Sequence, residues 1–443
     1  MNGVETVPQG GVKGRVRPLQ LVVAGLGFCT VFIDSFATQT VAVAGPLLKR
    51  ELAGGSEALG LIFGLNMLGG LIGALLFGAL GDRYGRRPLV IAALVIIAAG
   101  SWVSASAHSA SELALLRLLT GLGLGGALPN TVALVAEYAP PRWRSRFTAA
   151  VFNGFPLGAI IGSVVGARFV VAHGWRSIFL IGAGASAAIL LGVIILLPES
   201  LAKLRQRDRR QAYDRLLARL GSMGPELASE HARDAHGASS GSLVRLFAPK
   251  LVAAVALVSV ATFLSMLSQY SIMNWLPTLA TEAGIPIGAA IISLALLNIG
   301  AIAGNLLLAR IGDRRSPYVF TAVFYGLGGG LLVVLGMLIA SPAALVALSL
   351  VGGLLAFGAQ LSLTTITARL FDVDIRSTAV GWALAMGRVG AALGPMAAGW
   401  GFAHGMSIVA FMALVGLLFG LAGLSMLVLG RIDYTRRRAG SNV

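Results

Sequence analysis

The sequence predicts an all-α membrane protein with twelve transmembrane helices in two pseudo-symmetric six-helix bundles. Three observations predict this class: an apolar composition, twelve apolar runs long enough to cross a bilayer, and motifs that occur once in each half of the chain. Of the 443 residues, 56% are hydrophobic and only 12% are charged, whereas about 25% are charged in an ordinary soluble domain. We therefore expect lipid to be the solvent for most of the surface.

The charge pattern excludes a nucleic-acid-binding protein. The formal net charge is +16, but the basic residues stand in short clusters between apolar runs and do not collect in one domain. The first 18 residues contain an acid and two prolines and no compact apolar core with a cleavage site, so the first apolar run is expected to stay in the mature protein. The single cysteine, Cys29, cannot form an internal disulfide and is expected to be a small packing residue.

The apolar runs define the predicted spans. A membrane-crossing helix needs about twenty mainly apolar residues, and prolines, charge clusters and His/Ser breaks separate such runs here. The predicted spans are 18–46, 57–80, 88–107, 111–138, 146–172, 175–197, 248–279, 286–311, 317–340, 343–371, 376–402 and 405–430.

Basic residues near the ends of spans predict the orientation, because Lys and Arg are retained on the cytoplasmic side. They cluster in alternate loops, whereas the other loops hold little more than Lys49, Arg50 and Arg176. Both termini are therefore expected in the cytoplasm. The predicted organisation is an N-terminal tail (1–17), a first bundle (18–200), a basic cytoplasmic loop (201–247), a second bundle (248–432) and a C-terminal tail (433–443). The loop is expected to be a solvated linker, or a partly helical segment lying on anionic lipid.

The two halves carry matching motifs at a nearly constant offset. Gly81-Asp82-Arg83 recurs as Gly312-Asp313-Arg314, an offset of 312 − 81 = 231 residues. Three further matches have offsets of 231 or 232: Pro46 with Pro277, Arg144-Ser145 with Arg376-Ser377, and Gly158 and Gly162 with Gly390 and Gly394. Glycines in two glycine-rich helices can match by chance, but chance does not explain the matching Gly-Asp-Arg and Arg-Ser motifs. The sequence therefore predicts an internal repeat.

The stretch GDRYGRRP (81–88) lies in the predicted loop between spans two and three. Glycines allow a tight turn and close helix approach, and the arginines must stay outside the hydrocarbon. Asp82 is placed to cap a helix or to pair with an arginine across the interface between the bundles. The stretch therefore predicts a conformational gate; the alternative is that its charges only fix the topology. The predicted gate residues are Gly81, Asp82, Arg83, Gly85, Arg86, Arg87, Gly312, Asp313 and Arg314.

GDRYGRRP resembles the loop 2–3 signature of the major facilitator superfamily, whose members have two six-helix halves. Further stretches resemble its aromatic acid:proton symporter family, the permeases for benzoates, hydroxybenzoates and hydroxyphenylpropionates. They are RLLTGLGLGGALPNTVALVAEY (117–138), NWLPTL (274–279), FGAQLSL (357–363) and GWALAMGRVGAALGP (381–395). The resemblance extends from about residue 20 to about residue 430.

Asp34 lies in the middle of the first predicted span, where a charge is costly and therefore suggests function. A carboxylate at that depth suits a group that takes and releases a proton as access alternates; the alternative is a permanent pair with an arginine. Members of the family usually carry D-G-x-D here, whereas this chain has Asp34-Ser35-Phe36-Ala37. Proton coupling is then left to Asp34 alone or to another group such as Glu137.

Two arginines match those that the family keeps in its RLLTG and GRVG stretches. Arg388, near the middle of span eleven, is expected to bind the carboxylate of the cargo through its planar fork. Arg117 lies nearer the outer end of span four. It is expected either to bind cargo, or instead to neutralise Asp34 or shape the entrance.

Other polar and aromatic residues complete the predicted site. Glu137, at the end of span four, is expected to form a gate pair with Arg144; contact with the cargo and a pair with Arg83 are the alternatives. Tyr270, Asn274 and Trp275 are expected to line one wall, and Gln360 and Gln39 to bind a ring hydroxyl. Each of these five is otherwise a packing residue, and Trp275 is alternatively an interfacial anchor near the outer surface.

These features predict a secondary transporter that imports an aromatic or related organic acid with protons by alternating access. It is expected to work as a monomer in the bacterial inner membrane, surrounded by lipid, with the proton gradient as its energy source. No cofactor, metal, nucleic acid or enzyme activity is expected, because no reacting or metal-binding constellation is visible. The alternatives are an efflux antiporter, although span five lacks the G-P-x-x-G-G step of that class, and a membrane sensor that does not transport.

Overall fold

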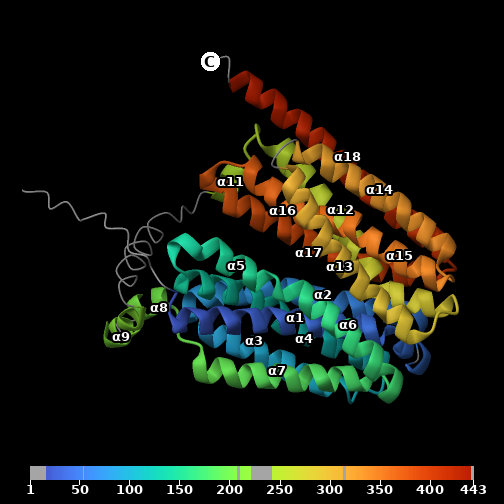
Figure 1. The fold of residues 1–443 in the computed structure, drawn as a ribbon, viewed down its shortest axis with the longest axis horizontal. Coiled ribbons are helices and arrows are strands. Elements are labelled where there is room, and N and C mark those ends of the chain that lie inside the picture. Colours follow the sequence, from blue (N-terminus) through green and yellow to red (C-terminus); the bar gives the residue numbers. More distant parts are fainter. Residues whose placement is uncertain (1–15, 53, 207–209, 221–241, 313–315, 441–443) are drawn as a thin grey trace, which may run out of the picture.

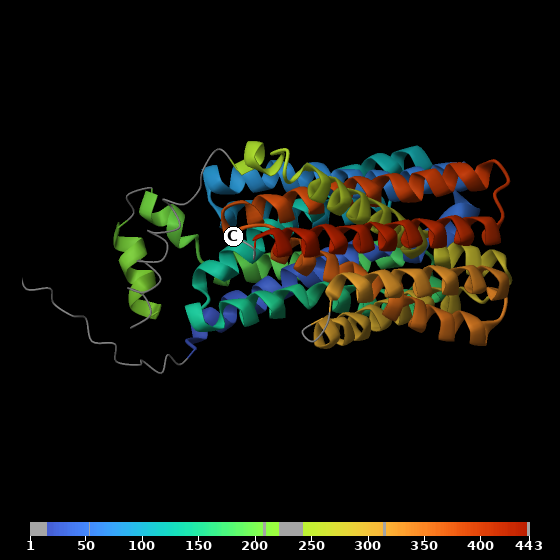
Figure 2. The same ribbon diagram turned by 90° about the horizontal axis from the view of Figure 1, so that it is seen from above.

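The long helices run side by side along one axis in two groups, one from each half of the chain (Figures 1 and 2). The computed structural model describes residues 16–52, 54–206, 210–220, 242–312 and 316–440, and its regular elements are all helical. The helices of the first half are α1 Pro18–Glu51, α2 Gly55–Tyr84, α3 Arg86–Ser104, α4 Ala110–Tyr138, η1 Pro141–Trp143, α5 Arg144–Phe152, α6 Gly154–His173 and α7 Arg176–Leu196.

The second half repeats this arrangement after a connecting segment, whose described residues form short helices. These are α8 Leu201–Gln206, α9 Arg210–Leu220 and α11 Ser242–Leu246. The helices of the second half are α12 Val252–Glu282, α13 Ile287–Gly312, α14 Pro317–Leu338, α15 Pro342–Gly352, η3 Gly353–Phe357, α16 Gly358–Leu370, α17 Val373–Ala403 and α18 Ile408–Gly440. The segment η3 is a π-helical turn that joins α15 and α16 into one span.

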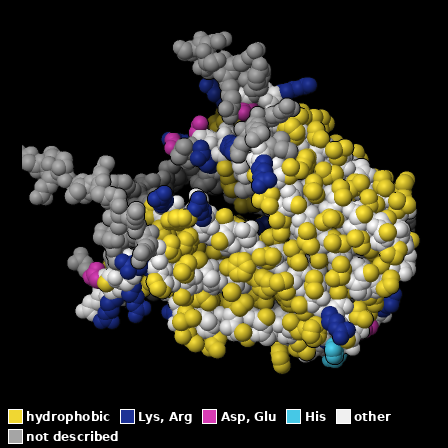
Figure 3. Space-filling model, in the orientation of Figure 1, with side chains coloured by type: hydrophobic (Ala, Val, Ile, Leu, Met, Phe, Trp, Pro, Cys, Tyr) yellow, Lys and Arg dark blue, Asp and Glu magenta, His cyan; other side chains and the backbone are white. Residues whose placement is uncertain are grey.

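The twelve predicted spans are confirmed. Within the described residues, eleven helices are long and apolar enough to cross a membrane, and the twelfth predicted span is the 31-residue helix α17. Arg388, Pro395 and several glycines make α17 less apolar than the others. Hydrophobic side chains cover most of the broad face in Figure 3, as expected for a surface in lipid.

Pro46, at the end of the first predicted span, and Pro277, near the end of the seventh, do not end their helices, so both spans are longer than predicted. Both lie inside the helix, and α1 and α12 continue to Glu51 and Glu282. Prolines are tolerated inside membrane helices because neighbouring groups satisfy the freed backbone carbonyls. The additional turns place Lys49 and Glu282 at the end of the molecule opposite the termini.

Glycines hold the repeated helices in matching contacts. A β-carbon on Gly158 of α6 would overlap the Phe32 carbonyl of α1, and one on Gly390 of α17 would overlap the Phe263 carbonyl of α12. The two carbonyls are again 263 − 32 = 231 residues apart. The internal repeat predicted from the sequence is therefore also a repeat of helix contacts, as in close packing through small residues.

The two halves meet closely at the end opposite the termini. There Lys49 of α1 pairs with Glu282 of α12, and a β-carbon on Gly60 of α2 would lie 2.9 Å from Cα of Gly399 in α17. At the other end, the surface between the halves is hollowed and bordered by basic side chains (Figure 3). In this conformation the space between the halves opens toward the end that carries the termini.

Candidate functional site

Three helices bring polar groups together half-way along the molecule. Asp34 lies at the middle of α1 and is 5% exposed. The positive charge of Arg388, at the middle of α17, acts on this carboxylate. The hydroxyl of Tyr270 in α12 is within the electrostatic range of both. Because α1 belongs to the first half and α17 and α12 to the second, the two halves share this site.

Arg388 also connects the halves by a hydrogen bond. Its Nη1 donates to the backbone carbonyl of Gly70 in α2, at 2.8 Å. Gly70 has no side chain to shield that carbonyl from the guanidinium. Arg388 is only partly buried, so part of its guanidinium remains accessible for another acceptor.

Several buried polar atoms close to this level have no hydrogen-bond partner in the described part of the chain. They are Gln39 Nε2 on α1, Asn66 Oδ1 on α2, and Ser268 Oγ and Gln269 Oε1 on α12. Buried polar atoms are nearly always paired in proteins, so such orphans indicate a place for water or ligand. Gln39 is among the residues predicted from the sequence; Asn66 and Gln269 are not, although each interrupts an apolar run.

Gln360 is held by a second polar group. It lies on α16 directly after the π-helical turn and is 5% exposed, and its Oε1 accepts a hydrogen bond from the hydroxyl of Tyr325 at 3.0 Å. The Tyr325 hydroxyl also lies within hydrogen-bond reach of Ser265 on α12. Since the amide oxygen is occupied, the Nε2 group of Gln360 is the end left to donate to a ligand.

Asn274 and Trp275 pack within the protein. The Nδ2 of Asn274 donates to the Tyr270 carbonyl one turn earlier at 2.8 Å. Trp275 is fully buried and donates from Nε1 to the Pro395 carbonyl at 3.0 Å. Its ring meets Phe63 of α2 edge-on, with 5.6 Å between centroids. Trp275 therefore neither anchors the protein at the membrane surface nor lines an open cargo site, because its ring fills the contact between the two halves.

Arg117 lies elsewhere, inside the first half. It is fully buried and donates to the Gly100 carbonyl and to Thr120 Oγ1, each at 3.0 Å, and to Ser104. Its guanidinium also lies 4.7 Å from the ring centroid of Phe179. The expectation that Arg117 neutralises Asp34 is wrong for this structure, because its side chain points toward α3 and α7. No part of it is exposed to a cargo.

The predicted gate pair between Glu137 and Arg144 is also wrong, and so is the alternative with Arg83. Glu137 Oε1 accepts from Arg86 Nη1 at 2.7 Å and from Ser200 Oγ at 2.9 Å. Its Oε2 accepts from the backbone N–H of Leu201, the first residue of α8, at 2.9 Å. The structure thus fixes Glu137 to the loop α2–α3 and to the segment after α7. Sequence spacing could not identify this partner, because Arg86 lies 51 positions away.

The described contacts of the GDRYGRRP stretch lie within the first half. Asp82 lies 3.8 Å from Arg86 on its own side of the interface, and within the described residues it forms no ion pair across the interface. Gly81 packs against Asn130 of α4. Gly85 has φ +108°, a backbone conformation that favours glycine, and ends α2.

The other arginines of GDRYGRRP also contact neighbouring groups. Arg87 donates from its backbone N–H to Glu199 Oε1 at 3.3 Å and from Nη2 to the Ile194 carbonyl at 2.7 Å. Arg83 lies over the ring of Tyr84. Gly312 ends α13, and Asp313 and Arg314 lie outside the described residues.

Two related helical halves around a shared, charged, buried site define a membrane transporter. The chain belongs to the major facilitator superfamily, whose sequence model matches residues 27–395 and 258–441. It is a multi-pass membrane transporter and not an enzyme. Groups of three or more His, Cys, Asp or Glu side chains that suit a metal do not occur within the described residues.

Relatives with known cargo cover nearly the whole chain. The chain is 32% identical to the gallate transporter of Pseudomonas putida, over 94% of this chain and 93% of that one. It is 30% identical to the 4-hydroxybenzoate transporter PcaK of Pseudomonas putida, over 89% and 90%. It is 31% identical to the 3-(3-hydroxy-phenyl)propionate transporter of Escherichia coli, over 92% and 94%.

Solved structures share the fold. A D-xylose-proton symporter superimposes with a TM-score of 0.69 at 16% identity, over 92% of this chain and 97% of that one. A bacterial homologue of the human lysosomal transporter Spinster, in an inward-facing and occupied conformation, superimposes with a TM-score of 0.69 at 15% identity, over 95% and 96%.

Proposed function

We propose that the protein imports an aromatic acid anion together with a proton across the bacterial inner membrane by alternating access, with both termini in the cytoplasm. The observation that carries this proposal is the electrostatic interaction between the buried carboxylate of Asp34 and the partly buried guanidinium of Arg388, which belong to opposite halves and lie at the middle of their helices. The names of the relatives support an aromatic acid as the cargo. The basic loops support the orientation.

Arg388 is the docking group for the cargo carboxylate. In this conformation its Nη1 donates to a neutral carbonyl at Gly70. A carboxylate forms shorter, charge-assisted and bidentate bonds with a guanidinium, so it competes well with that carbonyl. When the carboxylate binds, Arg388 can release α2, and cargo binding is thereby linked to the contact between the halves.

Asp34 couples the proton to this step through charge balance. With cargo bound, the site holds one guanidinium and two carboxylates. Burial of an uncompensated charge is costly, and a proton on Asp34 restores neutrality. The loaded site is then neutral and can cross between the two access states. Release of the anion toward the cytoplasm removes one negative charge, so that the positive charge of Arg388 again favours the ionised form of Asp34, which gives up its proton.

Proteoliposomes with labelled 4-hydroxybenzoate and gallate test the proposal. We expect wild type to accumulate the acid against its gradient when the outside is acidified. Asp34→Asn should lose this accumulation and still exchange acid between the two sides, because the cation that docks the cargo remains. Glu57→Gln, an exposed acid on α2, is the matched control. Concentrative uptake by Asp34→Asn would refute the coupling role, and proton-driven export would make the protein an efflux antiporter.

Arg388→Lys tests the docking role. Lysine keeps the charge but loses the planar fork, so we expect the KM for uptake to rise about tenfold, the value of roughly 1.4 kcal/mol of lost binding. Arg168→Lys, on the exposed side of α6, should leave the KM unchanged. An unaltered KM in Arg388→Lys would place the docking group elsewhere.

A further inference from the structure

Asn66 is a buried amide whose oxygen has no hydrogen-bond partner within the described residues. It lies on α2 and is 2% exposed, and the unpaired atom is Oδ1. A buried acceptor that stays unpaired is costly, so buried amides are nearly always paired in proteins. Asn66 therefore requires a hydrogen-bond donor that no described residue supplies in this conformation.

The internal repeat shows that helix packing does not require an asparagine at this position. A β-carbon on Gly121 of α4 would overlap the Asn66 carbonyl. In the second half, a β-carbon on Gly353 of η3 would overlap the Leu297 carbonyl of α13. The offsets are 297 − 66 = 231 and 353 − 121 = 232 residues, so Leu297 is the counterpart of Asn66. Leu297 is fully buried, and a leucine therefore suits the same backbone contact.

Asn66 lies on a side of α2 that meets the second half. Phe63, one turn earlier, contacts the ring of Trp275 in α12 edge-on. Gly70, one turn later, accepts the hydrogen bond of Arg388 through its carbonyl. Residues three and four positions apart share one side of a helix, so Asn66 lies between these two contacts. Its level is between Arg388 and the closed end of the molecule, where cargo enters in the proposed direction.

The spacing along α2 fits a hydroxyl on the far side of an aromatic ring. Asn66 and Gly70 are four residues apart, which is a rise of roughly 6 Å in an α-helix. This is close to the distance across a benzene ring from a carboxyl carbon to a hydroxyl oxygen at position 4. A cargo whose carboxylate replaces the Gly70 carbonyl at Arg388 thus reaches the level of Asn66 with that hydroxyl.

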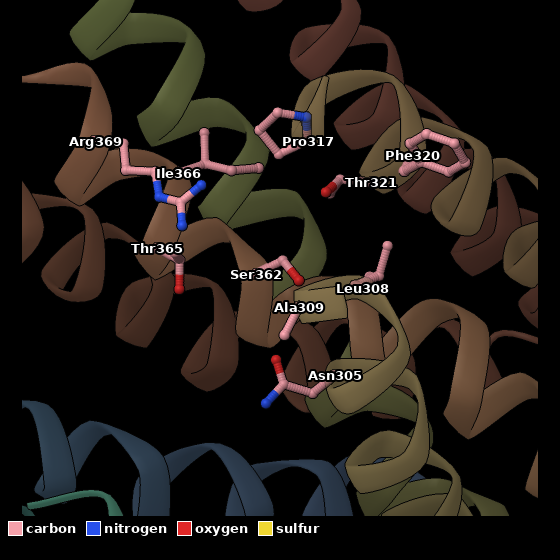
Figure 4. Close-up of a pocket in the computed structure, with 10 residues that line it drawn as sticks. All are labelled: Asn305, Leu308, Ala309, Pro317, Phe320, Thr321, Ser362, Thr365, Ile366 and Arg369. Atoms are coloured by element: carbon pink, nitrogen blue, oxygen red, sulfur yellow. The ribbon is translucent and has the colours of Figure 1, made fainter. Parts of the chain in front are cut away.

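The amide of Asn305 on α13 is a contrasting case. It is only partly buried and borders a cavity of about 260 Å³ between α13, α14 and α16 (Figure 4). Water that enters such a cavity can pair with a polar group on its wall. Asn66 does not line this cavity and is almost fully buried. A donor on a ligand that enters the shared site is therefore the suitable partner for its oxygen.

We propose that Asn66 Oδ1 accepts a hydrogen bond from a hydroxyl at position 4 of the cargo ring, and so selects acids that carry a donor there. The proposal rests on the proposed function, which places the cargo carboxylate at Arg388. A site that hydrogen-bonds a substrate hydroxyl discriminates strongly against an analogue without it, because the buried acceptor is then left unpaired. The same residue contributes nothing to the recognition of unsubstituted benzoate.

Competition between two labelled acids for uptake into proteoliposomes tests the proposal. With 4-hydroxybenzoate and 4-fluorobenzoate in one reaction, the two rates give the ratio of kcat/KM independently of the amount of active protein. Fluorine is close to a hydroxyl in size but donates no hydrogen bond. We expect wild type to prefer 4-hydroxybenzoate at least about tenfold, and Asn66→Leu to reduce this preference to less than about twofold.

Two controls accompany this variant. Asn298→Leu makes the same exchange at a buried asparagine of α13, whose Nδ2 donates to the Leu294 carbonyl, and it should keep the wild-type preference. 2-Hydroxybenzoate carries its hydroxyl beside the carboxylate, out of reach of Asn66, so its uptake relative to 2-fluorobenzoate should be the same in wild type and Asn66→Leu. The melting temperature of Asn66→Leu should equal or exceed that of wild type, because Leu297 occupies the equivalent contact.

The possible failures are distinguishable. An unchanged preference in Asn66→Leu, with or without slower uptake of both acids, would overturn the role of Asn66 and leave the proposed function intact. Equal uptake of 4-hydroxybenzoate and 4-fluorobenzoate by wild type would also overturn it and would assign the Asn66 oxygen to water. Failure of wild type to take up any of these acids would contradict the proposed function itself.

Discussion

Asp34 and Arg388 are two opposite charges in the middle of an otherwise apolar membrane protein. Removal of either would leave the other as an uncompensated charge, and such charges are costly at this depth in a membrane. Ala37 is fully buried at the position where members of the family usually carry a second aspartate. In the proposed mechanism, coupling therefore depends on the single carboxylate of Asp34.

One carboxylate predicts one proton for each monovalent anion. The proton cancels the charge of the anion, so uptake should be electroneutral. We expect a pH gradient to drive uptake of 4-hydroxybenzoate into proteoliposomes, and a potassium diffusion potential set with valinomycin to change the initial rate by less than about twofold. A strong dependence on the potential would indicate a second proton and a further coupling group.

Arg117 is predicted to act in stability and not in binding. Arg117→Met removes hydrogen bonds from a charged donor to Gly100 and Thr120, each worth about 1.5–3 kcal/mol. The variant should melt at a clearly lower temperature in detergent and keep a KM for uptake within about twofold of wild type. A KM that rises as in Arg388→Lys would show that Arg117 contacts cargo in another conformation.

At the scale of elements, glycines decide how closely the helices of one half approach. On α2, a β-carbon on Gly73 would overlap the backbone of Leu122 in α4, whereas one on Gly78 would meet nothing within 4 Å. Because both glycines lie in the same helix, a comparison of their alanine variants separates the effect of contact between helices from the effect of helix propensity. Alanine is otherwise the better helix former by about 1 kcal/mol.

Gly73→Ala and Gly78→Ala therefore have opposite expected effects. Gly73→Ala should lower the melting temperature and the yield of folded protein, because α2 and α4 must move apart. Gly78→Ala should leave the melting temperature unchanged or raise it slightly. Equal melting temperatures for the two variants would mean that the α2–α4 contact tolerates the extra methyl group.

At the scale of the whole molecule, the described conformation is closed at one end and open at the other. The closed end combines the Lys49–Glu282 pair with the approach of Gly60 to Gly399. Transport requires this end to open, since cargo must enter there in the proposed direction. The contacts that close it must therefore be weak enough to break in each cycle, as expected of an ion pair that is partly exposed.

Locking this end should stop transport. Cys29 is the only native cysteine, so Cys29→Ser gives a background for Lys49→Cys with Glu282→Cys. We expect a short thiol cross-linker that contains a disulfide to abolish uptake by the double variant, and a reductant to restore it. The single variants should be unaffected. Full uptake by the cross-linked protein would show that this end does not need to open.

The sequence by itself determined the class, the twelve spans, the repeat and the depth of Asp34 and Arg388 in the membrane. These properties depend on position along the chain, and hydropathy and motif spacing report that position directly. Only the tertiary structure decided which neighbour each polar side chain meets. It placed Arg117 among Gly100, Ser104 and Thr120, gave Glu137 to Arg86, and continued α1 and α12 past their prolines. The physical reason is that helical periodicity fixes a residue's direction relative to its own helix, whereas the helix that lies in that direction is chosen by packing between segments far apart in the chain.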